Sequence, residues 1–322
     1  MQGKSKSLNH IKLIMKNLFS FFVFLNFIFS CQFNNYETVE KNNTFRNKIT
    51  GGNFIELKDG HTYYEIDNND KKNTLIFIHG FSVPSYIWDE TYYSAIDKGY
   101  KVLRLDLYGR GYSDNPDVEY TDELFANQVI ELLEKIKIQK ATFLGLSNGG
   151  RVISKIAYIN PDVVEKLIFV SSNSFMEHET NLEKSVTGKE INDFIRNKYP
   201  SISKGQLSDF KHPENFKNWA SKYEELLKHK GFARALVSTV KNHENLDIEN
   251  SFINNSNIPY FLVWGDSDST VVYKDFENKL KKIMTRKKEY FISDSGHIPN
   301  KENIKEFENI LFNKILINNF KN

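Results

Sequence analysis

A short glycine-rich turn between an apolar run and an amphipathic stretch is the feature that most constrains the fold of this chain. Residues 141–144 form the apolar run, residues 145–150 read Gly-Leu-Ser-Asn-Gly-Gly, and residues 151–157 are apolar at helical spacing. A G-x-S-x-G pattern at a strand-to-helix junction is typical of a tight turn in which the two backbones nearly touch. Such a turn strains Ser147 at the positive end of a helix and makes it a candidate nucleophile. An ordinary glycine-rich turn would look the same, so the interpretation depends on the rest of the chain.

Short apolar runs alternate with longer amphipathic stretches from residue 53 onward. Continuous apolar runs are typical of strands buried on both faces. They occupy residues 74–78, 102–105, 143–144, 167–170, 260–264 and 289–292, and helical patterns occupy residues 122–138, 271–284 and 302–317. An Asp-Gly pair at residues 59–60 predicts a β-hairpin between residues 54–57 and 62–66. The alternation predicts an α/β fold, with helices on both faces of a mostly parallel sheet.

The segment between residues 174 and 259 breaks this alternation. It holds amphipathic stretches rich in Lys and Glu, but no strong buried-strand run. We therefore predict a core over residues 51–174 and 259–322, interrupted by a helical cap over residues 175–258. Residues 31–50 are polar and rich in Asn, and they are interpreted as a tether or a loosely packed entry into the fold.

The N-terminal segment has the order of charges and apolar residues of an export signal. Residues 1–30 carry four lysines and no acidic residue, and an apolar run of about a dozen residues occupies residues 18–29. This run is shorter than the roughly 18 residues expected of a membrane span. The order predicts a signal peptide over residues 1–30. The only cysteine, Cys31, follows directly, so an internal disulfide is excluded.

The residues around this cysteine indicate how the mature chain could be held. Ile28-Phe29-Ser30-Cys31 resembles the lipobox of bacterial lipoproteins, in which the cysteine is lipidated and becomes the mature N-terminus. The resemblance implies a membrane-anchored protein that faces the periplasm or the cell exterior. A simply cleaved signal with an incidental cysteine and a retained anchor remain alternatives. Removing the four N-terminal lysines lowers the formal net charge from +2 to −2, so charge gives no case for a nucleic-acid partner.

A histidine and two aspartates follow the last two apolar runs. A serine nucleophile needs a base within hydrogen-bond reach and a carboxylate that orients the base. Residues 265–268 read Gly-Asp-Ser-Asp, and residues 293–297 read Ser-Asp-Ser-Gly-His. We predict His297 as the base, because it follows Ser147 and the carboxylates in the required chain order. Both Asp266 and Asp268 are candidates for the acid.

Several segments resemble the α/β-hydrolases. Residues 265–268 resemble the family's G-x-x-D segment, whose final Asp is the triad acid, so the resemblance points to Asp268. Residues 171–173, where some relatives carry the acid, hold no carboxylate. Residues 79–81 with Trp88 resemble the H-G-F…W segment, and residues 106–114 resemble the D-x-x-G-x-G-x-S loop. Covering about residues 53–318, the resemblance implies a mostly parallel, eight-stranded sheet flanked by helices, with a helical cap.

The resemblance also implies roles for residues around the nucleophile. The backbone N–H groups of Phe81 and Asn148 would form the oxyanion hole. His79 would hold its loop by a hydrogen bond, and Asp106 and Arg110 would be scaffold residues.

Together these features predict a serine hydrolase that cleaves a small, apolar carboxylic ester through Ser147, His297 and Asp268, without metal or cofactor. Carbon–carbon bond or amide hydrolysis and acyl transfer use the same residues, and a non-catalytic surface binding protein on this fold is a further alternative. A few apolar cap residues are expected to face Ser147, and the others to form the core of the cap. The candidates are Phe175, Met176, Phe194, Phe210, Phe216, Trp219, Tyr223 and Phe232.

Overall fold

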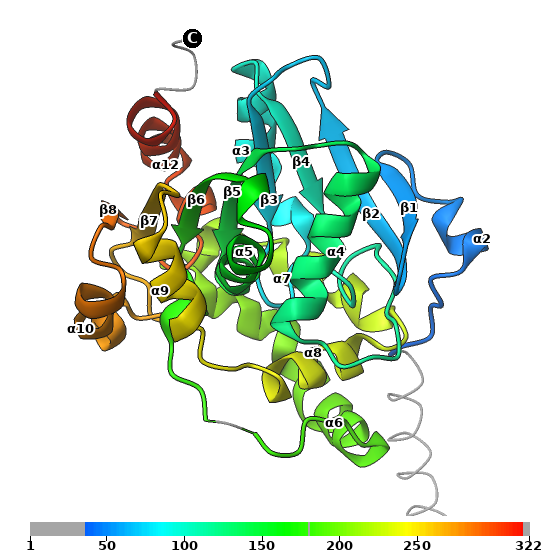
Figure 1. The fold of residues 1–322 in the computed structure, drawn as a ribbon. Helices are drawn as coiled ribbons and strands as arrows, with labels where there is room; N and C mark the ends of the chain where they lie inside the picture. Colours follow the sequence, from blue (N-terminus) through cyan, green and yellow to red (C-terminus); the bar gives the residue numbers. More distant parts are fainter. Residues whose placement is uncertain (1–35, 180, 318–322) are drawn as a thin grey trace, which may run out of the picture.

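One eight-stranded sheet organises the computed structural model, which describes residues 36–179 and 181–317 (Figure 1). The strand order is β1-β2-β4-β3-β5-β6-β7-β8. The strands are β1 Asn53–Leu57, β2 Gly60–Asp67, β3 Thr74–Ile78, β4 Lys101–Leu105, β5 Ala141–Leu146, β6 Val164–Val170, β7 Tyr260–Gly265 and β8 Lys288–Ile292. Strand β2 pairs antiparallel with β1 and β4, and the remaining neighbours pair in parallel. The predicted α/β fold with a mostly parallel sheet is confirmed.

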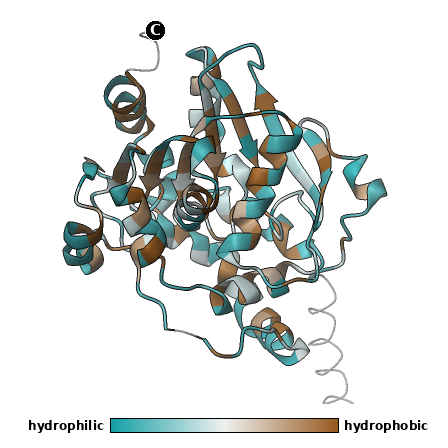
Figure 2. Ribbon diagram, viewed as in Figure 1, coloured by the Kyte–Doolittle hydropathy of each residue, from teal (hydrophilic) through white to brown (hydrophobic). Residues whose placement is uncertain are grey.

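Every residue of the central strands β3 and β5 is buried, which shows that these strands are covered on both faces. Figure 2 shows hydrophobic residues concentrated in these strands, with hydrophilic residues on the outlying turns. Helices α4 (Asp122–Lys135), α5 (Asn148–Ile159) and α10 (Tyr273–Ile283) contribute to the apolar cluster on one face. Helices α3 (Asp89–Asp97) and α12 (Ile304–Ile310) contribute to the cluster on the other face. This layering places the loops after the parallel strands at one edge of the sheet.

The predicted cap region is helical and lies beyond one end of the sheet, where α6 and α8 are visible (Figure 1). Its elements are α6 Gly188–Gly205, η4 Gln206–Asp209, η5 Pro213–Asn215, α7 Trp219–Glu224, η6 Glu225–Lys228, α8 Phe232–Lys241 and α9 Asp247–Asn255. Helix α9 packs on α5, and Ile253 of α9 joins the apolar cluster of the core. By its packing, α9 therefore belongs with the helices that cover the sheet, although its sequence falls within the predicted cap range.

Shorter helical segments connect the main elements. They are α2 Asn43–Arg46, η1 Ser85–Trp88, η2 Pro161–Val163, η3 Asn173–Phe175, α11 Pro299–Glu302 and the π-helical η7 Leu311–Ile315. Among the described residues, no helix combines the length and the apolar character needed to cross a membrane.

Residues 36–50, called the N-terminal strap below, contact the body of the protein through hydrogen bonds. The Glu37 carboxylate accepts hydrogen bonds from the N–H groups of Gly231 and Ala233 at the start of α8. The Lys41 ammonium donates to the Ser113 carbonyl at 2.6 Å and to Asn115 Oδ1 at 2.7 Å. The interpretation of residues 31–50 as a tether or a loosely packed entry into the fold stays a prediction, and residues 36–50 contact the body through the side chains of Glu37 and Lys41. The predicted signal peptide and Cys31 lie outside the described residues.

Candidate active site

The turn at Ser147 joins β5 to α5 and holds the serine in a strained conformation. Ser147 has φ 51° and ψ −116°, which is unfavourable for a residue with a side chain. A Cβ atom at Gly145 would lie 2.4 Å from the Gly149 carbonyl oxygen, and one at Gly149 would lie 2.4 Å from the Ile78 carbonyl oxygen. Only glycines fit at these two positions, which explains why the G-x-S-x-G pattern could be recognised in the sequence.

A buried histidine and a buried aspartate lie together at the ends of β7 and β8. His297 Nδ1 and Asp268 Oδ2 are 2.9 Å apart. The other oxygen of this carboxylate, Asp268 Oδ1, accepts the N–H groups of Thr270 and Val271, both at 2.9 Å. The carboxylate is thereby fixed in orientation and in turn directs the imidazole ring.

The surroundings of His297 raise its pKa above the ordinary value. Burial by itself disfavours the charged imidazolium, but the hydrogen bond and negative charge of Asp268, with the charge of Asp209, outweigh it. A histidine in this environment is well suited to hold a proton taken from a neighbouring hydroxyl.

Ser147 and His297 line the same cavity of about 200 Å³. Its lining residues are Gly80, Phe81, Ser82, Val83, Ile87, Leu146, Ser147, Gln206, Asp209, Thr270, His297 and Ile298. Within the described part of the chain, no hydrogen bond joins the Ser147 hydroxyl to the His297 ring. Catalytic hydrogen bonds are often long without substrate and tighten when it binds. The structure therefore brings Ser147, His297 and Asp268 to one cavity, with the aspartate behind the histidine.

The two residues predicted to supply the oxyanion donors lie close to Ser147 in chain or in space. Asn148 is the first residue of α5, so its N–H has no partner within the helix. Phe81 lines the cavity, and a Cβ atom at neighbouring Gly80 would lie 3.4 Å from Ser147 Cβ. The Phe81 carbonyl accepts a hydrogen bond from Arg110 Nε at 2.7 Å, which fixes the peptide that follows.

His79 is buried beside this loop, and its ring hydrogen-bonds only to backbone groups among the described residues. Its Nδ1 lies 2.9 Å from the Gly80 carbonyl, and its Nε2 accepts the Leu107 N–H at 2.9 Å. Because Nε2 must be the acceptor, the ring carries its proton on Nδ1. Burial lowers the pKa of His79 to about 3, and the charge of Arg110 adds to the effect against the opposing Gly80 hydrogen bond. These contacts match the structural role expected for His79.

The other scaffold residues bind backbone groups of the same region. Asp106 accepts the N–H groups of Ser85 at 2.9 Å and Tyr112 at 2.8 Å. Arg110 connects core and cap, because its NH2 group donates to Thr239 Oγ1 of α8 at 2.9 Å. Both residues therefore hold loops in place.

The competing aspartate, Asp266, binds its neighbour Ser267 and backbone groups of the loop that follows β8. It accepts hydrogen bonds from Ser267 Oγ at 2.8 Å and from the Asp294 N–H at 3.1 Å. Asp268, not Asp266, is the carboxylate that contacts His297.

Two cap residues near the serine were not foreseen from the sequence. Gln206 and Asp209 of η4 line the cavity, and none of the apolar cap residues expected there does so. Phe175, Phe210, Trp219, Tyr223 and Phe232 are instead buried in the apolar clusters. The segment Gln-Leu-Ser-Asp carries no recognisable motif, so only the three-dimensional approach of the cap reveals it. The expectation of an apolar cap lining is thus wrong for this cavity.

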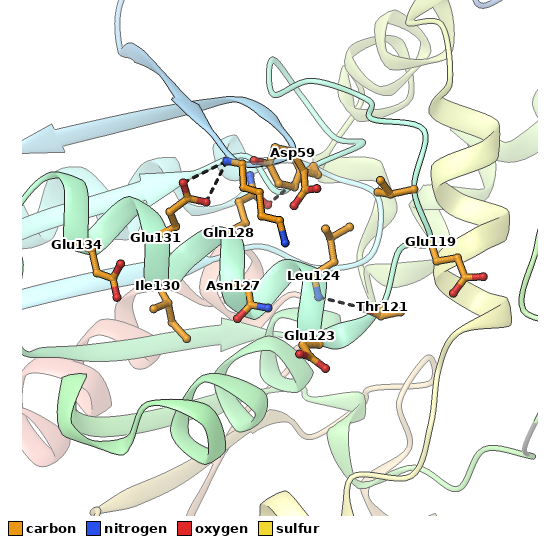
Figure 3. A pocket seen from close by; sticks show the side chains of 13 residues that line it. Asp59, Glu119, Thr121, Glu123, Leu124, Asn127, Gln128, Ile130, Glu131 and Glu134 are labelled. Carbon is orange, nitrogen blue, oxygen red and sulfur yellow. Dashed lines mark hydrogen bonds between the residues drawn. The ribbon is translucent and has the colours of Figure 1, made fainter.

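A second hollow, of about 500 Å³, lies along α4 (Figure 3). It is acidic, with five carboxylate side chains from Asp59, Glu119, Glu123, Glu131 and Glu134. Both oxygens of Glu131 accept the Lys58 N–H at 3.1 Å. The residues that line it include no Ser, Cys or His, and the described residues contain no cluster of His, Cys, Asp and Glu suited to a metal ion. The candidate active site is therefore the cavity at Ser147.

Comparison with known proteins agrees with this geometry. The family model described as alpha/beta hydrolase fold matches residues 73–252, more than half of the chain. The chain belongs to the alpha/beta hydrolase fold family.

Individual relatives are distant. Lipase 3 of Moraxella sp. is 24% identical over 267 residues, which cover 76% of this chain and 78% of the lipase. An uncharacterized protein of Mycobacterium tuberculosis is 34% identical over 98 residues, but the match spans only 28% of that protein and 30% of this chain. The esterase of Exiguobacterium antarcticum has a similar structure, with a TM-score of 0.68 at 20% identity, covering 81% of this chain and 98% of the esterase. At this identity the likeness supports the fold alone.

Proposed function

We propose that the protein is a serine hydrolase that cleaves small carboxylic esters at Ser147. The observation that carries the proposal is the 2.9 Å contact between His297 and Asp268 in a cavity that the strained Ser147 also lines. The similarity to a lipase over most of both chains supports the same reaction class.

In the proposed mechanism, His297 takes the proton of Ser147 as the hydroxyl oxygen attacks the ester carbonyl. Asp268 keeps the imidazole in the required tautomer and stabilises its positive charge. The N–H groups of Phe81 and Asn148 receive the negative charge that develops on the carbonyl oxygen. His297 then protonates the leaving alcohol, and water activated by the same ring releases the acid from Ser147.

A fluorophosphonate probe tests this proposal, because such probes modify activated serines. We expect the probe to label Ser147, as located by mass spectrometry, and Ser147→Ala to lose the label and about a millionfold in kcat. Ser208→Ala is the matched control, since Ser208 is an exposed serine of η4 whose hydroxyl donates only to the Gly205 carbonyl within the described part of the chain. Substantial turnover by Ser147→Ala would overturn the assignment. Failure of the folded wild-type protein to label would favour a non-catalytic binding protein.

We further propose that the protein is exported and lipidated at Cys31. The support is the order of basic residues, short apolar run and small residue before the single cysteine. Palmitate labelling in a bacterial host should be present in the wild-type chain and absent in Cys31→Ser. Palmitate labelling that persists in Cys31→Ser would rule out lipidation at Cys31.

A further inference from the structure

The cap contributes only polar side chains to the cavity beside Ser147. Among the described residues that line it, Gln206 and Asp209 come from the cap, and the other lining residues come from the core. No lysine or arginine is among them. A substrate placed at Ser147 would therefore meet an amide and a carboxyl group where the sequence suggested aromatic rings.

Asp209 is held in position by two contacts with the catalytic loops. Its carbonyl oxygen accepts the His297 N–H at 2.8 Å, and its Oδ1 accepts the Thr270 hydroxyl at 3.0 Å. A Cβ atom at Gly296 would lie 2.8 Å from the Asp209 carbonyl oxygen, so the absence of a side chain there permits this close approach. Asp209 is thus fixed relative to the base even though it belongs to the cap.

One oxygen of this carboxyl group is left for a ligand. Within the described residues, Asp209 Oδ2 accepts no hydrogen bond, whereas Oδ1 is occupied by Thr270. Burial raises the pKa of the Asp209 carboxyl, opposed by the nearby His297. Among the described residues that line the cavity, His297 is the only other titratable group, and the free carboxyl oxygen can accept a hydrogen bond from a donor on the substrate.

On the basis of the proposed function, we infer that Asp209 selects small, neutral esters that carry a hydroxyl group. The hydroxyl donates a hydrogen bond to Asp209 Oδ2 while the ester carbonyl lies at Ser147. The cavity volume of about 200 Å³ is below the roughly 300–1,000 Å³ of sites for drug-sized ligands, which limits the substrate to a few carbon atoms. An anionic ester is disfavoured because its charge would lie near the Asp209 carboxyl group, and the described residues that line the cavity include no lysine or arginine.

Matched pairs of small esters test the inference through kcat/KM measured by pH-stat. The pairs are methyl 2-hydroxypropanoate with methyl propanoate, methyl 3-hydroxybutanoate with methyl butanoate, and 2-hydroxyethyl acetate with propyl acetate. Together they place the hydroxyl at different points of the acyl and alcohol groups. We expect at least one hydroxyl ester to be preferred by about tenfold to a hundredfold, as for a hydrogen bond to a charged group. Monomethyl succinate should be hydrolysed more slowly than methyl butanoate.

Two variants connect this selectivity to Asp209. Asp209→Leu removes the acceptor, and we expect the preferred pair to approach equal kcat/KM. Asp209→Asn keeps the size of the side chain but removes its charge, so the hydroxyl preference should fall and the relative rate of monomethyl succinate should rise. The control is Glu214→Gln, because Glu214 is an exposed carboxylate of η5 outside the cavity and should leave the ratios of wild type.

The outcomes separate this inference from the proposed function. Hydrolysis of the esters without hydroxyl preference, or a preference that persists in both Asp209 variants, overturns the inference and leaves the serine hydrolase standing. Absence of both ester hydrolysis and fluorophosphonate labelling in wild type overturns both. If Asp209→Leu fails to label, Asp209→Asn alone decides, and an unchanged ratio there overturns the inference.

Discussion

Two buried histidines in loops after sheet strands have opposite properties. His79 follows β3, contacts backbone groups, and has its pKa lowered to about 3 by burial, with Arg110 adding to the effect. His297 follows β8, contacts the Asp268 carboxylate, and has its pKa raised although it is equally buried. The difference lies in the partner. The Asp268 carboxylate stabilises the imidazolium of His297 more than burial disfavours it, whereas the hydrogen bond to the Gly80 carbonyl does not offset burial and the charge of Arg110 at His79. The loop after β8 therefore holds a proton acceptor suited to catalysis. The loop after β3 holds a histidine that is neutral near pH 7 and supports the backbone around it.

The largest expected difference between the two histidines is in turnover. His297→Gln removes the base, and we expect kcat to fall by about 10⁴-fold to 10⁶-fold with the fold intact. His79→Gln keeps an acceptor for the Leu107 N–H, so its kcat should fall by no more than about tenfold. Ester hydrolysis by both purified variants makes the measurement, with circular dichroism as the folding control. Comparable losses in the two variants would contradict the division of roles.

A second test changes Asp268, the partner of His297, and leaves the histidine in place. Asp268→Asn should lower kcat by about 10⁴-fold, because an amide no longer holds the required tautomer or stabilises the imidazolium. Asp266→Asn, in the same loop, should stay within about threefold of wild type, since a change away from the reacting groups has little effect on catalysis. Steady-state kinetics on one ester decide between them, and a larger loss for Asp266→Asn would transfer the acid role to that residue.

His79 should contribute more to the stability of the fold than to the rate of catalysis. His79→Ala leaves the buried Leu107 N–H without an acceptor, which costs about 1–3 kcal/mol of unfolding free energy in addition to the cavity created. Urea unfolding followed by tryptophan fluorescence measures this loss. A variant as stable as wild type would show that water or another group replaces the ring.

A further difference is expected in the pH dependence of stability. Since His79 has a folded-state pKa of about 3, below its unfolded value, its contribution is fully present above the unfolded pKa of roughly 6.5. As pH falls from there toward 3, the unfolded chain binds a proton that the folded protein does not. The unfolding free energy should then fall by up to about 1.4 kcal/mol per pH unit. Urea titrations at pH 7, 6 and 5 should show that the unfolding free energy of His79→Gln depends less on pH than that of wild type. The same pH dependence in both proteins would contradict a neutral His79 in the folded state.

The sheet and the nucleophile turn could be predicted because their signals are local in sequence. Buried parallel strands require continuous apolar runs, and the turn at Ser147 requires glycines at Gly145 and Gly149, so both requirements appear directly in the residues. The loops that carry His297 and the two aspartates could be located because they follow predicted strands, whereas the choice of Asp268 over Asp266 depended on the resemblance to the α/β-hydrolases.

The cap contacts could not be predicted, because they depend on how distant segments meet. Asp209 reaches His297 through a backbone carbonyl, which every residue carries, and through the space above Gly296. The contact of His243 could not be predicted for the same reason. Its Nε2 lies 2.8 Å from Asn148 Oδ1, although the two residues are far apart in the sequence. The charged residues of the N-terminal strap resemble those of a solvated linker, and only their partners show that they are bound.

The N-terminal strap also determines how the molecule would carry a mechanical load. Its first contacts are those of the Tyr36 ring with Tyr199 and of Glu37 with the start of α8 and the Tyr199 hydroxyl. Lys41 follows, and then the Arg46–Asp114 ion pair at 2.8 Å. Tension applied at residue 36 would therefore reach the helices above the cavity before it reached β1. If the chain were attached to a surface through its amino end, tension would act first on the cap helices α6 and α8. It would act on the sheet that carries Ser147 only afterwards.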